Sequence, residues 1–133
     1  MRTDMQTRRI RIVTEATGAV EAEITWGRNP KTAEAVWRAL PIEANAERWG
    51  EEVYFPIPVE MGLENPQETV EVGDLGYWPP GNSLCIFFGP TPISRGREIR
   101  PASPVNIFGR IIGNPKVFNR VRSGDTIRVE AAE

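Results

Sequence analysis

The fold of this protein is decided by the stretch GDLGYWPPGNSLCIFFGPTP, which runs from Gly73 to Pro92. Its proline, glycine and asparagine residues at 79–82 predict a tight turn, because these residue types fit the backbone angles of turns. A short strand at 75–78 precedes the turn, and the segment that follows it, 83–88, carries few polar side chains. We therefore expect 83–88 to be a central strand of a sheet.

The aromatic side chains of this stretch occur as two adjacent pairs, Tyr77-Trp78 and Phe87-Phe88. Adjacent residues of a strand point to opposite faces, so one member of each pair should face the core and the other the outer surface. A partly exposed ring beside a Pro-Gly turn suits a ligand-binding platform as well as simple packing against the prolines. The pattern leaves open which member of each pair faces outward.

Outside this stretch, apolar and polar residues alternate in several short segments, which is the pattern of half-buried strands. Glu52 and Tyr54 share one face of such a segment, and the apolar residues between and after them share the other. Together with the two strands above, the pattern predicts eight strands, at 9–13, 20–26, 42–46, 51–57, 75–78, 83–88, 105–112 and 126–130.

Two Asn-Pro pairs, at 29–30 and 114–115, predict the starts of two short helices. Asparagine is a favoured N-cap acceptor, and proline at the first helical position loses no needed donor. Eight short strands with two short capping helices predict an all-β protein, a closed or nearly closed β-barrel.

The segment 89–104 has no regular pattern and contains Arg95, Arg97 and Arg100. Such a long connection is uncommon in a compact domain, so we expect this loop to be functional or mobile. Its arginines can clamp an acidic ligand or remain solvated.

The composition excludes several classes of function. The chain of 133 residues is expected to form a single domain over 1–133, with 1–8 as a flexible N-terminus. A net charge of −2 gives no basic excess for nucleic-acid binding. There is no apolar run of membrane-spanning length and no signal-peptide pattern at the N-terminus, so we expect a cytoplasmic protein.

Histidine is absent and Cys85 is the only cysteine. Ser-His and Cys-His nucleophile pairs and internal disulfides are therefore impossible, and we expect no metal and no cofactor. Cys85 itself should be buried and unreactive. Four carboxylates, Glu51, Glu52, Glu60 and Glu64, lie near each other in sequence. Such a group can do acid–base work or bind a cation, but it is more often a solvated surface.

Three motifs resemble those of cyclophilins, in the same order along the chain. They are the helix start Asn29-Pro30-Lys31-Thr32, the segment Pro90-Thr91-Pro92, and the strand VNIFGRI at 105–111. The chain resembles more closely a prokaryotic family of small cyclophilin-like proteins of unassigned function, whose hallmarks are similar to WGEEVYF at 49–55, GDLGYWPPG at 73–81, FFG at 87–89 and TPIS at 91–94. This resemblance implies an eight-stranded β-barrel capped by helices.

Cyclophilins are prolyl isomerases, and their reaction needs an arginine donor at the prolyl nitrogen. By the resemblance, Pro56 and Ile57 occupy the positions of the histidine and arginine of the catalytic strand, so the cation is missing. By the same resemblance, Met61 corresponds to the methionine of the cyclophilin pocket. Leu63 occupies the position of the cyclophilin glutamine, and Ile93 that of the tryptophan. We therefore assign no catalytic residue.

The first hypothesis is a barrel that binds a proline-containing peptide or a small metabolite in a surface groove. We place that groove at Glu52, Tyr54, Met61, Tyr77, Phe87, Thr91 and Asn106. A weak prolyl isomerase, in which a loop arginine substitutes as donor, is the alternative. A third hypothesis, from resemblance alone, is a subunit of an enzyme that opens lactams. Exposed aromatic rings and edge prolines also permit a homodimer.

Overall fold

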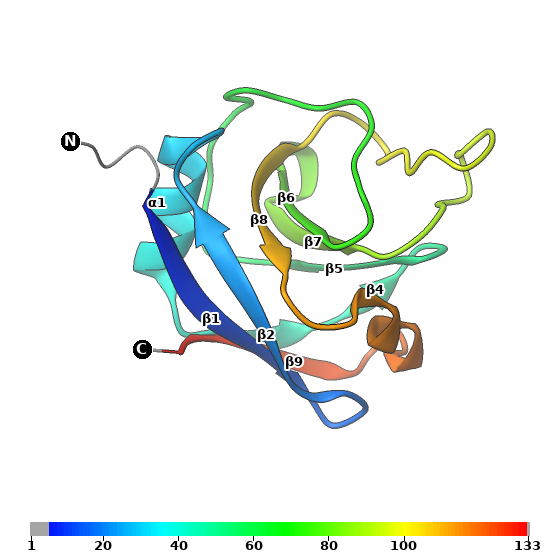
Figure 1. Cartoon of the computed structure of the whole chain (residues 1–133), viewed down its shortest axis with the longest axis horizontal. Helices are drawn as coiled ribbons and strands as arrows, with labels where there is room; N and C mark the ends of the chain where they lie inside the picture. Colours follow the sequence, from blue (N-terminus) through cyan, green and yellow to red (C-terminus); the bar gives the residue numbers. More distant parts are fainter. Residues whose placement is uncertain (1–5, 133) are drawn as a thin grey trace.

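The computed structural model describes residues 6–132, in which one antiparallel sheet curls into a nearly closed barrel (Figure 1). The sheet has the strand order β3-β9-β1-β2-β8-β6-β7-β5-β4. Its strands are β1 (Thr7–Thr14), β2 (Gly18–Thr25), β3 (Ile42–Asn45), β4 (Glu47–Arg48), β5 (Glu52–Pro56), β6 (Asp74–Trp78), β7 (Ser83–Phe87), β8 (Asn106–Ile111) and β9 (Thr126–Ala131).

The barrel closes through the segment 42–48, and this explains why residues 6–132 form nine strands instead of the predicted eight. The predicted strand 42–46 breaks at Ala46, giving β3, which pairs with β9, and β4, which pairs with β5. Ala46 bonds at the break to the turn before β9, donating its N–H to Asp125 O (2.7 Å) and accepting from Gly124 N (2.8 Å). One continuous segment thus joins the two edges of the sheet.

The N-terminal strand begins earlier than the sequence pattern indicates. Strand β1 already includes Thr7 and Arg8 and pairs with β2 along its whole length. Of the other residues in the segment 1–8 that is predicted to be flexible, Gln6 accepts a hydrogen bond from Trp26 N through its carbonyl oxygen (3.1 Å), and residues 1–5 lie outside the described residues.

Helix α1 (Pro30–Ala39) packs against β2 and β8 and buries Thr32, Ala33 and Val36. The helix starts after Asn29 as predicted, but the prediction that the Asn29 side chain accepts a capping hydrogen bond is wrong. The buried Asn29 side chain instead donates to Ile107 O (2.7 Å) and accepts from Asn65 N (2.7 Å). The Glu64 carboxylate serves the helix start, accepting from the N–H groups of Lys31 and Thr32 at 3.0 Å each. An anion at this position also suits the helix dipole.

Two 3₁₀ helices complete the structure. The short η2 (Pro79–Gly81) forms the turn between β6 and β7, as the Pro-Pro-Gly-Asn sequence predicts. The second predicted helix is η3 (Pro115–Arg120), and here the cap prediction is confirmed, because Asn114 accepts from Lys116 N at 3.1 Å. In Figure 1, α1 and η3 lie on opposite sides of the barrel.

The sheet separates two apolar clusters. The main cluster fills the barrel and includes Tyr77 and Phe88. A smaller cluster lies on the outer face of β5, β6 and β7 and includes Phe87, with Trp78 packed against it. The structure thus decides the question that strand alternation left open: Tyr77 and Phe88 face inward, and Trp78 and Phe87 face outward.

The long loop at 89–104 (largely yellow in Figure 1) is tied to the segment before β6. Val70 and Ile99 form an isolated bridge, and Gln67 and Val105 form another just after the loop. Ile99 and Val105 are buried in the outer cluster, so this part of the chain covers the outer face of the sheet. Within residues 6–132, no helix combines the length and apolar character required to cross a bilayer.

Candidate ligand-binding cavity

Strands β5 and β7 supply the floor of a cavity on the outer face of the barrel. Tyr54 and Cys85 are partners in the antiparallel register, and Glu52 lies opposite Phe87. Since alternate residues share a face, Glu52, Tyr54, Cys85 and Phe87 all point away from the barrel core. The prediction that Glu52 and Tyr54 share one strand face is confirmed, because Val53 and the other apolar positions of this strand belong to the core cluster.

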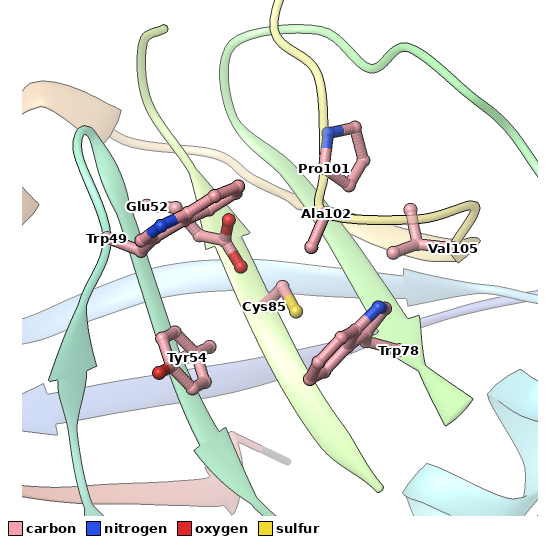
Figure 2. Close-up of a pocket in the computed structure, with 8 residues that line it drawn as sticks. All are labelled: Trp49, Glu52, Tyr54, Trp78, Cys85, Pro101, Ala102 and Val105. Carbon is pink, nitrogen blue, oxygen red and sulfur yellow. The ribbon is translucent and has the colours of Figure 1, made fainter. Parts of the chain in front are cut away.

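The walls of this cavity come from three further parts of the chain (Figure 2). The turn before β5 contributes one tryptophan, the end of β6 another, and the segment that leads into β8 contributes three small or ring-shaped apolar residues. The cavity has a volume of about 260 Å³ and is lined by Trp49, Glu52, Tyr54, Trp78, Cys85, Pro101, Ala102 and Val105. Its three large aromatic rings are half-buried and Ala102 is exposed, so the cavity opens to solvent between the loop and the sheet.

Backbone contacts fix the turn that carries Trp49 and Glu52. Gly50 has a φ of +62°, a conformation that L side chains rarely adopt, and a Cβ atom there would lie 2.8 Å from Pro92 Cδ. Next to it, Glu51 N donates to Pro90 O and Phe88 N donates to Glu51 O, at 3.0 Å each. The start of the long loop is therefore locked against the turn, which holds the cavity walls together.

A side-chain hydrogen bond fixes the opposite wall. The Trp78 indole Nε1 donates to Ser103 Oγ at 2.7 Å. Ser103 follows the two loop residues that line the cavity, so this bond connects the end of β6 to the loop. The ring of Trp78 is held with its apolar surface toward the cavity (Figure 2).

Glu52 is the polar group inside this otherwise largely apolar space. Its side chain points into the cavity (Figure 2), the residue is only 5% exposed, and Oε1 has no hydrogen-bond partner among the described residues. Burial raises the pKa of Glu52 from 4.5 to about 7, while a side-chain hydrogen bond with the Cys85 thiol acts in the opposite direction. Buried polar atoms are nearly always paired in proteins, so this unpaired oxygen calls for an explanation.

The charges around Glu52 do not include a counter-ion. No basic residue is among the eight described residues that line the cavity. Of the charged residues next to the lining, Glu51 pairs with Lys116 (3.7 Å). Arg100 Nε lies 3.6 Å from Glu98 Oε2 and has no hydrogen-bond partner among the described residues. Burial raises the pKa of the Cys85 thiol well above its usual value, which makes this cysteine an unreactive thiol in the cavity floor.

The cavity brings together only two of the seven residues predicted for a groove, Glu52 and Tyr54. Phe87 lies on the same side of the sheet but is fully buried in the outer cluster. Tyr77 lies inside the barrel, where its hydroxyl donates to Val59 O (2.6 Å) and accepts from Met61 N (3.3 Å).

The remaining three predicted residues have contacts within the fold. Met61 packs against the barrel core. Asn106 donates to Thr32 Oγ1 (3.1 Å) and accepts from Glu64 N (2.9 Å), joining helix α1 to the loop before β6. The Thr91 hydroxyl donates to Arg100 O, and this hydrogen bond connects the start of the long loop to its later part.

Sequence reasoning missed six of the lining residues: Trp49, Trp78, Cys85, Pro101, Ala102 and Val105. Two of them carried a usable signal. Cys85 shares a strand face with Phe87 by simple alternation, and Trp78 is the outward partner of an aromatic pair. The loop residues had none, because an irregular segment has no period that assigns it to a face.

The four carboxylates that are close in sequence are separated in space. Glu51 forms the ion pair described above, Glu64 caps helix α1, Glu60 is exposed, and only Glu52 enters the cavity. Across residues 6–132, no three histidine, cysteine or acidic side chains are placed so that they could hold a metal ion. The arrangement can offer one buried acceptor and an aromatic wall to a ligand.

Comparison with known proteins agrees with this architecture. A family model described as Cyclophilin-like matches residues 8–130. The solution structure of a hypothetical protein from Archaeoglobus fulgidus is similar, with a TM-score of 0.82 and 41% sequence identity over 99% of this chain and 100% of that chain. A search of curated proteins found no significant match. The resemblance drawn from the sequence motifs is therefore confirmed, and the chain belongs to the cyclophilin-like family.

Proposed function

We propose that this protein binds a small molecule, or a short segment of a peptide, in the cavity on the outer face of the barrel. The observation that carries the proposal is the Glu52 carboxyl group, buried at 5% exposure with Oε1 unpaired and pointed into a cavity of about 260 Å³. An unpaired buried acceptor costs about 1–3 kcal/mol. A ligand that donates to Glu52 would remove that cost on binding.

The composition of the cavity supports the same function. Ligand sites are typically concave and apolar, with a few polar groups that fix orientation. Here the aromatic and aliphatic surfaces come from β5, β6, β7 and the long loop, and Glu52 supplies the orienting group. Prolyl isomerisation has no comparable support, because its arginine donor has no counterpart among the residues that line the cavity.

The four tryptophans provide a direct test. Trp49 and Trp78 line the cavity. Trp37 belongs to helix α1 and contacts Trp26, which directly follows β2, with ring centroids 6.4 Å apart. In a ¹H–¹⁵N NMR titration with neutral amides, proline dipeptides and amines, a bound ligand should shift the indole signals of Trp49 and Trp78. The signals of Trp26 and Trp37 should stay in place and serve as an internal control.

The same titration on Trp78→Leu and Trp37→Leu variants shows whether binding depends on the cavity or on a tryptophan elsewhere in the fold. We expect loss of binding in the first variant and retention in the second, provided that both give folded spectra. Ligand-induced shifts centred on Trp26 and Trp37, or no response to any compound of the panel, would contradict the proposal.

A further inference from the structure

We infer that the ligand of this cavity is an organic cation, a protonated amine that donates to Glu52 and lies against the aromatic rings of Trp49, Tyr54 and Trp78. The inference rests on the proposed binding function and specifies the chemical class of the ligand. It follows from three features of the cavity: an acidic group without a counter-ion, aromatic rings on several sides, and limited volume.

The first feature is charge. Among the described residues that line the cavity, Glu52 is the acidic one and none is basic. A neutral donor would satisfy Oε1 but leave an ionised carboxylate uncompensated in an apolar environment, which is costly. A protonated amine supplies both the hydrogen bond and the opposite charge, and charge-assisted hydrogen bonds are roughly twice as strong as neutral ones.

The second feature is the aromatic wall. Trp49 and Tyr54 flank Glu52 on one side of the cavity, and Trp78 lies across from them (Figure 2). Aromatic faces attract ammonium groups by about 0.5–2 kcal/mol each, and cages of such rings recognise alkylated amines. The protein already uses this contact elsewhere, with Arg8 5.4 Å from the Trp37 ring centroid and Arg48 5.2 Å from that of Phe88.

The third feature is size. An apolar cavity of about 150 Å³ holds a benzene molecule. The volume of about 260 Å³ therefore accommodates one ring or a short alkyl chain together with an ammonium group, but not a folded peptide. A single amine-bearing side chain or a small free amine fits this limit.

The inference predicts a definite pH dependence. An ammonium ligand needs Glu52 in its ionised form, and burial places the pKa of that group at about 7. The other ionisable groups facing the cavity are the Cys85 thiol, which burial keeps protonated, and the Tyr54 phenol. Binding should therefore be about a hundredfold weaker at pH 5 than at pH 8, because protonation of Glu52 competes with the ligand.

The test uses benzylammonium and its neutral isostere benzyl alcohol, titrated into the full chain at pH 8 and pH 5. Binding is followed by the indole NMR signals of Trp49 and Trp78. We expect benzylammonium to bind at least about tenfold more tightly than benzyl alcohol at pH 8, as a charge-assisted hydrogen bond would produce. This preference should disappear at pH 5.

Two glutamate variants complete the experiment. Glu52→Gln should abolish the preference for the cation, whereas Glu51→Gln, which removes the same charge beside the cavity, should keep it. Equal or tighter binding of benzyl alcohol, or no binding of benzylammonium at pH 8, overturns the cation inference. Binding of benzyl alcohol or of a neutral amide at Trp49 and Trp78 would then still support the cavity, so the inference and the proposed function fail separately.

Discussion

The two faces of the sheet formed by β5, β7 and β6 are built from alternate residues of the same strands, yet they differ in how completely their polar groups are paired. On the inner face, the hydroxyl of Tyr77 both donates and accepts a hydrogen bond, although the residue is fully buried. On the outer face, Glu52 is almost as deeply buried and leaves Oε1 unpaired. The inner face also packs into the main core, whereas the outer face borders a cavity.

This difference distinguishes the face that stabilises the barrel from the face that is available for a ligand. A paired polar group such as the Tyr77 hydroxyl contributes to stability, while an unpaired buried carboxyl reduces it. Proteins retain such a destabilising group where function requires it, and perturbed ionisable groups in clefts are candidate functional residues for this reason. The inner face is therefore the scaffold of the barrel, and the outer face is the place to look for a ligand.

The largest effect should come from removing an inner-face ring. Phe55 is fully buried in the core and Tyr54, its neighbour in the strand, is half-buried on the outer face. We expect Phe55→Ala to lower the free energy of unfolding by about 3–5 kcal/mol, because it leaves a cavity in packed surroundings. Tyr54→Ala should cost about 1 kcal/mol. Urea denaturation of both variants measures the contrast, and similar losses would show that the two faces are equally important for stability.

Glu52→Gln should raise the free energy of unfolding at neutral pH instead of lowering it. The folded-state pKa of about 7 lies above the ordinary value of 4.5, so the native state retains a proton that the unfolded chain releases between these pH values. Stability of the wild type should therefore fall as the pH rises from 4.5 to about 7, by up to about 3 kcal/mol in total.

Glutamine removes this titration. The variant should be more stable than the wild type at pH 8 and nearly equal to it at pH 4.5, as measured by denaturation at both pH values. The Glu51→Gln variant is the control. In the wild type the Glu51 carboxylate pairs with Lys116 at the surface, so its removal should give no such gain in stability. A wild type whose stability does not change between pH 4.5 and pH 8 would disprove the burial argument.

A smaller effect than that of Glu52→Gln is expected for the paired hydroxyl of the inner face. Tyr77→Phe removes the donor to Val59 O and the acceptor of Met61 N. We expect a loss of about 1–2 kcal/mol at all pH values near neutrality, since Val59 O loses its donor and Met61 N loses its acceptor. A neutral or stabilising result in thermal or urea unfolding would mean that the two faces do not differ in the way described.

Much of the fold was predictable because it depends on local rules. Alternation identified most strands and placed Glu52 opposite the apolar positions of β5, and the turn residues at 79–82 marked the hairpin between β6 and β7. The failures arose where distant segments compete for the same groups. Asn29 does not cap α1 because its side chain is bound to Ile107 and Asn65, and the carboxylate of Glu64 takes its place.

The same reason explains the incomplete prediction of the site. The sequence predicts Tyr77 and Asn106 in the groove, but hydrogen bonds within the fold already use their side chains. Trp49 and Pro101 line the cavity although they lie far apart in the chain and belong to no common period. Strand alternation gives the face of a side chain, and it does not indicate what covers that face.

The sequence by itself determined that the chain forms a barrel of short antiparallel strands, and that Glu52 points away from its core. The direction of Glu52 follows from covalent geometry, since alternate side chains of a strand lie on opposite faces. The barrel follows from the number of short strands and from the resemblance to cyclophilins. Only the tertiary structure decided that the outward Glu52 is buried among aromatic rings with Oε1 unpaired. Burial depends on the loop at 89–104 folding over the sheet, and such long-range packing is not encoded in any local pattern.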